Sequence, residues 1–387
     1  MSTFVLDASR CRRFRSFRSI RSICVIPSQA RNAIKLHGCA IFDRICDRAR
    51  GRRSGQCHRS PLMPILTAAL RKTLETLEIY WVLARIMVPI TIMTELLSRM
   101  GVIEAIAPAF APVMSLVGLP PELGLAWLSG MLVGIWGAVP LIFVLVPASS
   151  LSVADITVFS ALLLFAHGLP IEQKIIQKAG PGMIATTLLR ILGGVLYAFL
   201  LHRLLAATGW LSSPANPTWI PMSATPEWTG FFTSLLETMI SMLVILLALS
   251  WGLEVLRVTG LLKLLMKALA PLLRLAGIRG EAGHFTAVGL FLGISYGGGL
   301  LIREARSGAV SPRQVFVSCV FMGFAHSVIE DTLIVVALGA DIGAVLGGRL
   351  VFALAATAAV AAVLRSVSDE TFFTWAFRAP NPQAVSR

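Results

Sequence analysis

The chain has 387 residues, of which 56% are hydrophobic and only 14% are charged. This composition excludes a soluble globular protein of such length and predicts a polytopic membrane protein. The net charge of +14 would suggest a nucleic-acid partner, but residues 1–62 hold 14 Lys or Arg against three Asp and account for +11 of it. Because the remaining chain carries only +3, we expect no nucleic-acid partner for the membrane part.

Residues 1–62 differ from the rest of the chain in that they lack an apolar period. Five of the six cysteines lie there: Cys11, Cys24, Cys39, Cys46 and Cys57. They form no CxxC pair, which argues against a zinc site. The stretch is either an arm for nucleic acid or anionic lipid, or an extension that is disordered or not translated at all, in which case Met63 is the start. We favour the extension, because MPILTAALRKTLETLEIYW from Met63 resembles a membrane-protein N-terminus with its own basic flank.

An internal repeat organises the membrane part. Residues 78–190 align with residues 237–349 at an offset of 159 without a gap, and 25 of 113 positions are identical. Most identical pairs are not Leu or Ala, so shared composition does not explain them. The repeat predicts a first unit at 63–207, a linker at 208–229, a second unit at 230–366 and a cytoplasmic tail at 367–387.

Each half predicts the same order of α-helical elements: a span, an amphipathic surface segment around a proline, an apolar segment with glycines, a helix carrying the triplet FAH, and a last span. LLKLLMKALAPLLRLAG from Leu261 shows the surface segment best, because its basic residues recur along one side. The linker contains no Lys or Arg and is predicted to be non-cytoplasmic. The basic residues elsewhere then place both termini in the cytoplasm.

Basic residues flank both ends of FTAVGLFLGISYGGGLLI, which predicts a re-entrant hairpin with GISYGGG near its turn. Its counterpart in the first half predicts a hairpin from the opposite side, with Gly137 and Pro140 near the bend. The expected fold is therefore an all-α inverted repeat, with three spans, a surface helix and a hairpin in each half. Eight full spans are the alternative, although they put one basic flank on the wrong side.

The second half resembles a known family through GISYGGGLLIREA, the following SP, and FAHSVIEDT. These residues are similar to the nucleoside recognition or Gate domain of spore maturation membrane proteins and, more distantly, of concentrative nucleoside transporters and the ferrous iron transporter B. The resemblance covers Leu74 to about Arg365. It implies a bacterial inner-membrane protein with paired hairpins and broken helices that hold substrate and coupling ion. No GxxxxGK[ST] motif occurs, so a direct nucleotide-driven mechanism is not expected.

FAHGLPIE and FAHSVIED are twins in the repeat, so His167 corresponds to His326 and Glu172 corresponds to Asp331. Ionisable residues in membrane spans are functional candidates. The candidate substrate- or ion-binding residues are His167, Glu172, His326, Glu330, Asp331, Ser295, Tyr296, Gly297, Gly298, Gly137 and Trp136. On a continuous helix His326 and Glu330 share one face, whereas Gly168 and Pro170 interrupt the first-half helix and free its carbonyls for a cation.

These candidates form either a proton relay or cation site, or a structural set in which each His bonds hairpin backbone and the acids cap helix ends. We expect a Gate-type transporter of a small polar solute, with nucleoside-like solutes as one candidate class, coupled to H⁺ or Na⁺. The alternatives are a non-transporting component of an envelope or spore-maturation complex and, third, a divalent-metal permease. No motif indicates an enzyme, a cofactor or a metal site. A homo-oligomer or a second Gate-type subunit is the expected kind of protein partner.

Overall fold

The computed structural model describes residues 62–215, 227–280 and 282–378. Most of the predicted extension at 1–62, the middle of the predicted linker and the end of the predicted tail lie outside these residues.

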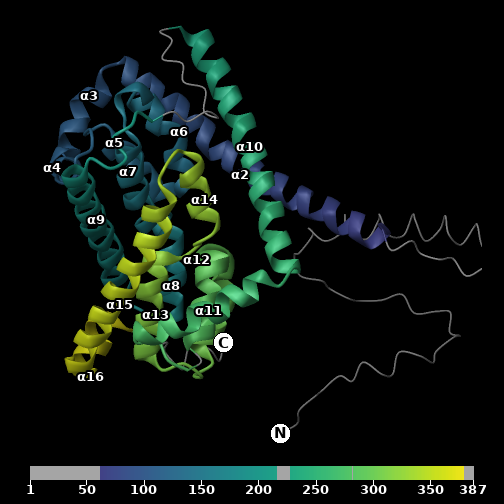
Figure 1. Cartoon of the computed structure of the whole chain (residues 1–387), viewed down its shortest axis with the longest axis vertical. Coiled ribbons are helices and arrows are strands. Elements are labelled where there is room, and N and C mark those ends of the chain that lie inside the picture. Colours follow the sequence, from purple (N-terminus) through teal and green to yellow (C-terminus); the bar gives the residue numbers. More distant parts are fainter. Residues whose placement is uncertain (1–61, 216–226, 281, 379–387) are drawn as a thin grey trace, which may run out of the picture. The chain divides into compact units, whose positions relative to one another are not determined.

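The described residues form helices with two isolated β-bridges (Figure 1). The elements of the first half are α2 (Leu62–Arg99), α3 (Val102–Ile106), η1 (Ala107–Phe110), α4 (Ala111–Leu116), α5 (Leu123–Val133), α6 (Ile135–Leu145), η2 (Ala148–Ser150), α7 (Val153–Phe165), α8 (Leu169–Ala179) and α9 (Met183–Thr208). Those of the second half are α10 (Trp228–Val258), α11 (Leu261–Leu275), α12 (Ala282–Arg306), α13 (Pro312–Ala325), α14 (Glu330–Ala337), η3 (Gly343–Gly348), α15 (Arg349–Ser366), α16 (Asp369–Thr371) and η4 (Phe372–Ala376).

Six segments in the described residues are long and apolar enough to cross a membrane, which confirms the prediction of an all-α polytopic membrane protein. Three come from each half: Lys72–Arg99, Val153–Ala179, Met183–Thr208, Trp228–Gly252, Pro312–Ala337 and Gly343–Ser366. The two glycine-containing apolar segments are not among them. The helices α5 and α6 have 11 residues each, so each is about 16 Å long and shorter than the roughly 30 Å of hydrocarbon.

A single glycine interrupts each of these apolar segments. Gly134 lies between α5 and α6 with φ 116° and ψ 176°, and these two helices pack against each other. Its counterpart Gly293 has φ 76° and ψ 162° and divides α12. Backbone angles of this kind are almost restricted to glycine, because a Cβ would clash with the chain. The repeat in the sequence is therefore also a repeat of backbone conformation.

The bend of the second half lies within the predicted GISYGGG, at its first residue Gly293, whereas the prediction of the first-half bend at Gly137 and Pro140 was wrong, because Gly134 forms it. Gly137 and Pro140 lie inside α6, and Gly297 and Gly298 lie inside the second part of α12. None of these three glycines has a positive φ, so their backbone continues the helix. In GIWG and in GISYGGG the first glycine, Gly134 or Gly293, has the non-helical backbone angles, and the glycines that follow it remain helical.

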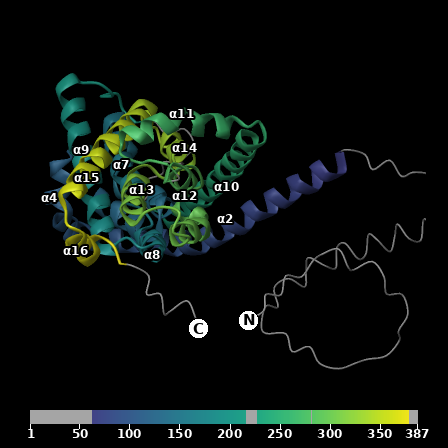
Figure 2. The ribbon, with the colours of Figure 1, turned by 90° about the horizontal axis from the view of Figure 1, so that it is seen from below.

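The two helices that carry FAH are the most enclosed spans, with 67% of the Val153–Ala179 window and 78% of the Pro312–Ala337 window buried. Both begin with good helix starts. Ser152 and Asp155 form a reciprocal capping box at α7, and Pro312 occupies the first turn of α13. The helix α13 packs against α9 and α15, and α7 packs against α9 (Figure 1, Figure 2). The core of the protein is thus built around the two broken helices.

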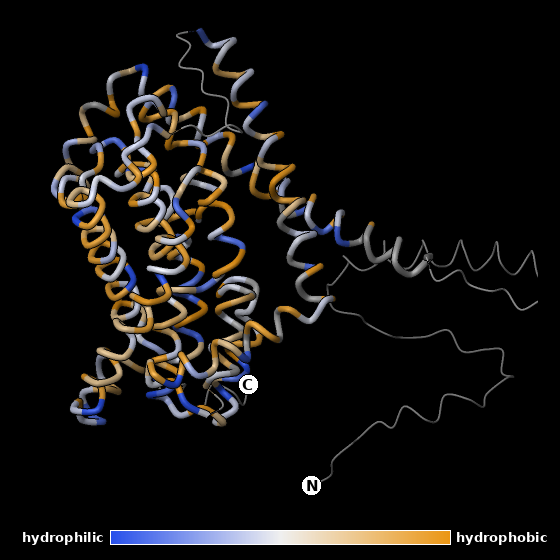
Figure 3. The backbone as a smooth tube through the Cα atoms, viewed as in Figure 1, coloured by the Kyte–Doolittle hydropathy of each residue, from blue (hydrophilic) through white to orange (hydrophobic). Residues whose placement is uncertain are grey.

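The other four spans have only 19% to 33% of their windows buried, which leaves apolar faces for lipid. The largely orange tube of α9 in Figure 3 illustrates this character. The predicted surface segment from Leu261 forms α11, which ends in a basic turn at Arg274. In the first half the corresponding stretch is divided among α3, η1 and α4.

The glycine at the break between α5 and α6 provides a test of backbone strain. A Cβ at Gly134 meets no atom within 4 Å, so Gly134→Ala introduces strain without a steric clash with neighbours. We expect this variant to lose about 1–3 kcal/mol of stability, seen as a lower thermal midpoint in detergent. Gly252→Ala is the matched control, because Gly252 also has open space but lies in α10 without a positive φ. Equal midpoints for the two variants would contradict the prediction.

Candidate functional site

Two histidine rings meet in the core where α7 and α13 end. The Nε2 atoms of His167 and His326 lie 3.1 Å apart, and the ring centroids lie 4.8 Å apart. Each Nδ1 lies 2.9 Å from a carbonyl oxygen one turn earlier, that of Leu163 for His167 and that of Met322 for His326. Because a carbonyl oxygen only accepts hydrogen bonds, both Nδ1 atoms carry a hydrogen. The two Nε2 atoms therefore face each other across the boundary between the halves.

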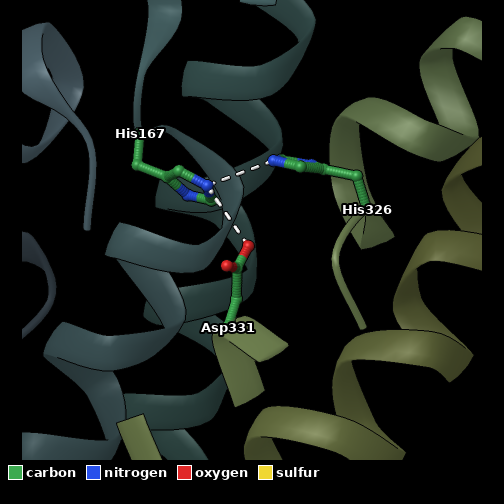
Figure 4. A group of neighbouring side chains, drawn as sticks. All are labelled: His167, His326 and Asp331. Carbon is green, nitrogen blue, oxygen red and sulfur yellow. Dashed lines mark hydrogen bonds and ion pairs between the residues drawn. The ribbon is translucent and has the colours of Figure 1, made fainter. Parts of the chain in front are cut away.

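A carboxylate from the opposite half approaches each histidine. The Asp331 carboxylate points toward the His167 ring (Figure 4), and its Oδ2 lies 3.3 Å from Nε2 of His167. Glu172 Oε2 lies 3.2 Å from Nε2 of His326. All four side chains are buried. The two contacts are reciprocal: the histidine of the first half contacts the acid of the second half, and the histidine of the second half contacts the acid of the first. The group joins the two halves through polar atoms in an apolar core.

Two buried arginines hold the broken ends of the helices. Arg190 donates from Nε to the carbonyl of Phe165 at 2.8 Å and from Nη2 to the carbonyl of His167 at 3.1 Å. Its Nη1 donates to Glu172 Oε2 at 2.7 Å. The C-terminal carbonyls of a helix carry partial negative charge, so they and the carboxylate offset the cost of burying the guanidinium.

Arg349 repeats this arrangement in the second half. It donates from Nε to the carbonyl of Phe324 at 2.8 Å and from Nη2 to the carbonyl of His326 at 3.2 Å. Its Nη2 also donates across the boundary to the carbonyl of Leu164 at 3.0 Å. Together with the bonds from Arg190 to Phe165 and His167, the bond to Leu164 takes up first-half carbonyls that the sequence predicted to be free for a cation.

The two arginines differ in one contact. Nη1 of Arg349 has no hydrogen-bond partner within the described part of the chain, whereas Nη1 of Arg190 is bound by Glu172. The counterpart of Glu172 is Asp331, whose side chain is one methylene shorter. Asp331 contacts His167 at 3.3 Å, which is longer than a strong charge-assisted hydrogen bond. The second half therefore holds its carboxylate less tightly than the first.

A cavity of about 170 Å³ lies beside the histidines. Residues from both helix breaks and from both interrupted apolar segments line it: Val133, Gly134, Ile135, Trp136, His167, Gly168, Ile171, Glu172, Gly293, Ser295, Ser327, Glu330 and Asp331, together with Leu83 and Leu246. Ser295 Oγ donates to Glu172 Oε1 at 3.4 Å and so links α12 to α8. The cavity is much larger than a single water needs, and its wall combines apolar and ionisable groups.

The predicted site residues fall into three groups. Trp136, His167, Glu172, Ser295, Glu330 and Asp331 line the cavity, and His326 lies directly behind His167. Gly137 and Gly298 do not line it: Gly137 receives a hydrogen bond from Ser129 at 2.8 Å, and Gly298 lies against Ile175. Gly297 is buried within α12, and the side chain of Tyr296 lies outside the description.

The predicted shared helix face of His326 and Glu330 was wrong. The helix α13 ends at Ala325, His326 is extended with ψ 164°, and α14 begins only at Glu330. Ser327 has a positive φ of 46°, like its counterpart Gly168. The break removes the i, i+4 relation and brings Asp331, rather than Glu330, to a histidine.

The sequence interpretation also missed Arg190 and Arg349 as members of the site. Both were visible as an identical pair at the offset of 159, and a charged residue within an apolar span is costly. A repeated arginine within an apolar span could therefore have been predicted to bind buried acceptors near the site. The predicted interruption at Gly168 is confirmed, with α7 ending at Phe165 and α8 beginning at Leu169.

The fold and the site define a polytopic membrane protein with a polar centre between two broken helices. Residues 239–341 match the family described as Gate, nucleoside recognition. The chain is also similar to the uncharacterized membrane protein YvoD of Bacillus subtilis (strain 168). The identity is 26% over 286 residues, which cover 73% of this chain and 90% of YvoD. No solved structure gives a significant match.

Removing one buried arginine tests its role in holding the broken helix ends. Arg349→Met leaves three carbonyls without their donor, and we expect a loss of about 3 kcal/mol or more in stability, since each unsatisfied buried acceptor costs about 1–3 kcal/mol. Thermal unfolding in detergent measures it. The control is Arg203→Met, because Arg203 is exposed on α9 and should change the midpoint little. A similar small change in both variants would refute the structural role of Arg349.

Proposed function

We propose that the protein is a Gate-type membrane transporter of a small polar solute, coupled to H⁺ or Na⁺. The observation that carries the proposal is the cavity in which both helix breaks and both interrupted apolar segments meet. Backbone irregularity at membrane depth is tolerated where it is buried in protein or lines a cavity, and transporters use such places as binding sites. The buried acids Glu172 and Asp331 supply charge for a cation or a polar solute.

We further propose that the two halves form an inverted repeat around a pseudo-two-fold axis. Corresponding residues touch each other only near such an axis, as they do in a two-fold symmetric dimer. Three such contacts support it: Tyr80 Oη donates to the Met239 carbonyl at 3.0 Å, the Phe165 and Phe324 rings lie 5.6 Å apart, and the His167 and His326 Nε2 atoms lie 3.1 Å apart. An axis through these points runs through the site.

The cavity volume restricts the class of solute. About 170 Å³ is smaller than the roughly 300–1,000 Å³ of pockets for drug-sized ligands. Small polar solutes and ions therefore fit this conformation better than a nucleoside, for which the cavity would have to widen. The name of the Gate family describes nucleoside recognition, and it does not by itself assign a nucleoside to this chain.

The proposed location is the bacterial cytoplasmic membrane, with both termini in the cytoplasm and the linker at 208–229 outside. The linker carries no Lys or Arg, whereas α11 and the end of α12 are basic. Fusions test this orientation. Alkaline phosphatase fused after Ala215 should be active, and a fusion at the C-terminus should be inactive while a green fluorescent protein fusion there is bright. The opposite pattern would reverse the proposed orientation.

Uptake of labelled solutes into proteoliposomes tests transport itself. A panel of small polar solutes, including nucleosides, is assayed with and without H⁺ and Na⁺ gradients. We expect gradient-dependent uptake of one class, and we expect Glu172→Gln to reduce it about 10-fold or more, because the contacts to Arg190 and His326 lose a charge. Ser295→Ala, which removes one weak contact to Glu172, should reduce uptake less.

Glu370→Gln is the matched control for these variants, since Glu370 is an exposed residue of α16 far from the cavity lining. Each variant is first shown to elute as one species in size-exclusion chromatography. Lack of gradient-dependent uptake across the whole panel would refute the proposal. Such a result with co-purification of an envelope complex would instead favour the non-transporting alternative.

A further inference from the structure

In the histidine pair, the Nε2 lone pairs have no hydrogen-bond donor among the described groups when both rings are neutral. Both Nδ1 atoms donate to backbone carbonyls, so the neutral form of each ring presents a lone pair at Nε2. Two lone pairs then face each other at 3.1 Å, with carboxylate oxygens at 3.2 and 3.3 Å. Acceptor atoms that converge in this way repel one another unless a positive species lies among them. In addition, Asp331 Oδ2 is buried and forms no hydrogen bond within the described part of the chain.

Two of the three distances between the candidate ligands, those from His167 to His326 and to Asp331, are close to the edges of a metal coordination sphere. Metal–nitrogen and metal–oxygen bonds of about 2.0–2.2 Å place two ligands of a tetrahedron roughly 3.3–3.5 Å apart. Ligand atoms of His167, His326 and Asp331 all lie within 4.8 Å of one another, and the measured pairs are 3.1 and 3.3 Å. Small shifts of the rings would therefore admit an ion.

The surroundings of the two rings are those of metal-binding histidines. A histidine ligand usually donates its other ring nitrogen to a carbonyl or carboxylate, which fixes the tautomer and the ring orientation. The bonds from His167 to Leu163 and from His326 to Met322 do this. Imidazole ligands favour Zn²⁺ and similar transition metals over Mg²⁺, Ca²⁺ or Na⁺, which prefer oxygen.

The local charge is compatible with a cation. Arg190 and Arg349 are close, but helix C-terminal carbonyls accept their hydrogen bonds, and Glu172 further neutralises Arg190. Asp331 has no such arginine contact, so no guanidinium competes with an ion for its carboxylate. Asp331 and His167 also line the cavity, so a coordination position open to the cavity remains for water or another ligand.

We propose that His167, His326 and Asp331 bind one divalent transition-metal ion such as Zn²⁺. Glu172 lies next to the ion, and one coordination position is open to the cavity. The ion would connect the two halves, because two ligands come from the second half and one from the first. This proposal does not rest on solute transport. Purified protein can bind the metal whether or not any solute is carried.

Co²⁺ titration of the full-length protein, carrying a Strep-tag and stripped with a chelator, tests the proposal. We expect one Co²⁺ per chain, with visible bands of four- or five-coordinate Co²⁺ and without the near-ultraviolet band of thiolate ligands. The absence of the thiolate band separates this site from the cysteines of residues 1–62. Zn²⁺ should displace Co²⁺ and raise the thermal midpoint, since an ion that binds only the folded state stabilises it.

Variants then assign the ligands. His167→Ala and Asp331→Asn should weaken Co²⁺ binding by at least about 10-fold. The control is His202→Ala, since His202 lies on α9 outside the cluster and should leave binding unchanged. The wild-type titration decides the matter even if a variant fails to fold. If wild-type protein takes up no Co²⁺ in a saturable manner, or if Asp331→Asn and His167→Ala bind it like wild type, the proposal is wrong and protons alone occupy the cluster.

Discussion

The structure depends on the satisfaction of backbone carbonyls where two helices break inside an apolar core. The ends of α7 and α13 leave carbonyl oxygens inside the buried core, and each unpaired group would cost several kcal/mol. Arg190 and Arg349 supply the donors, and each guanidinium serves more than one carbonyl. A planar fork with several donors suits this task better than an ammonium group. The breaks, the arginines and the cavity are consequently parts of one arrangement.

That arrangement also explains why the polar residues of the two halves meet. Because the breaks face each other, His167 and His326 come into contact, and each ring turns toward the acid of the other half. Buried polar groups of this kind add little net stability, since desolvation offsets their attraction. Their value lies in specifying how the halves fit together and in presenting charge to the cavity. A purely apolar contact between the helices would give neither.

The sequence was sufficient for the fold class, the six spans and the break after His167, because apolar length and a gapless repeat report directly on these features. It was insufficient where several glycines competed, since only backbone angles distinguish Gly293 from the glycines that follow it. It also failed at Glu330, where a continuous helix was assumed although the turn at residues 326–329 breaks it. The cluster of His167, His326 and Asp331 could not be recognised from spacing, because its members come from halves 159 residues apart and from opposite sides of a helix break.

The difference of one methylene between Glu172 and Asp331 makes the two halves unequal partners. Glu172 retains Arg190 of its own half if the halves separate, whereas Asp331 has only the weaker contact with His167 and would be left solvated or alone. The two carboxylates occupy corresponding positions in the repeat, yet unequal sets of contacts hold them. This inequality arises from the length of a single side chain.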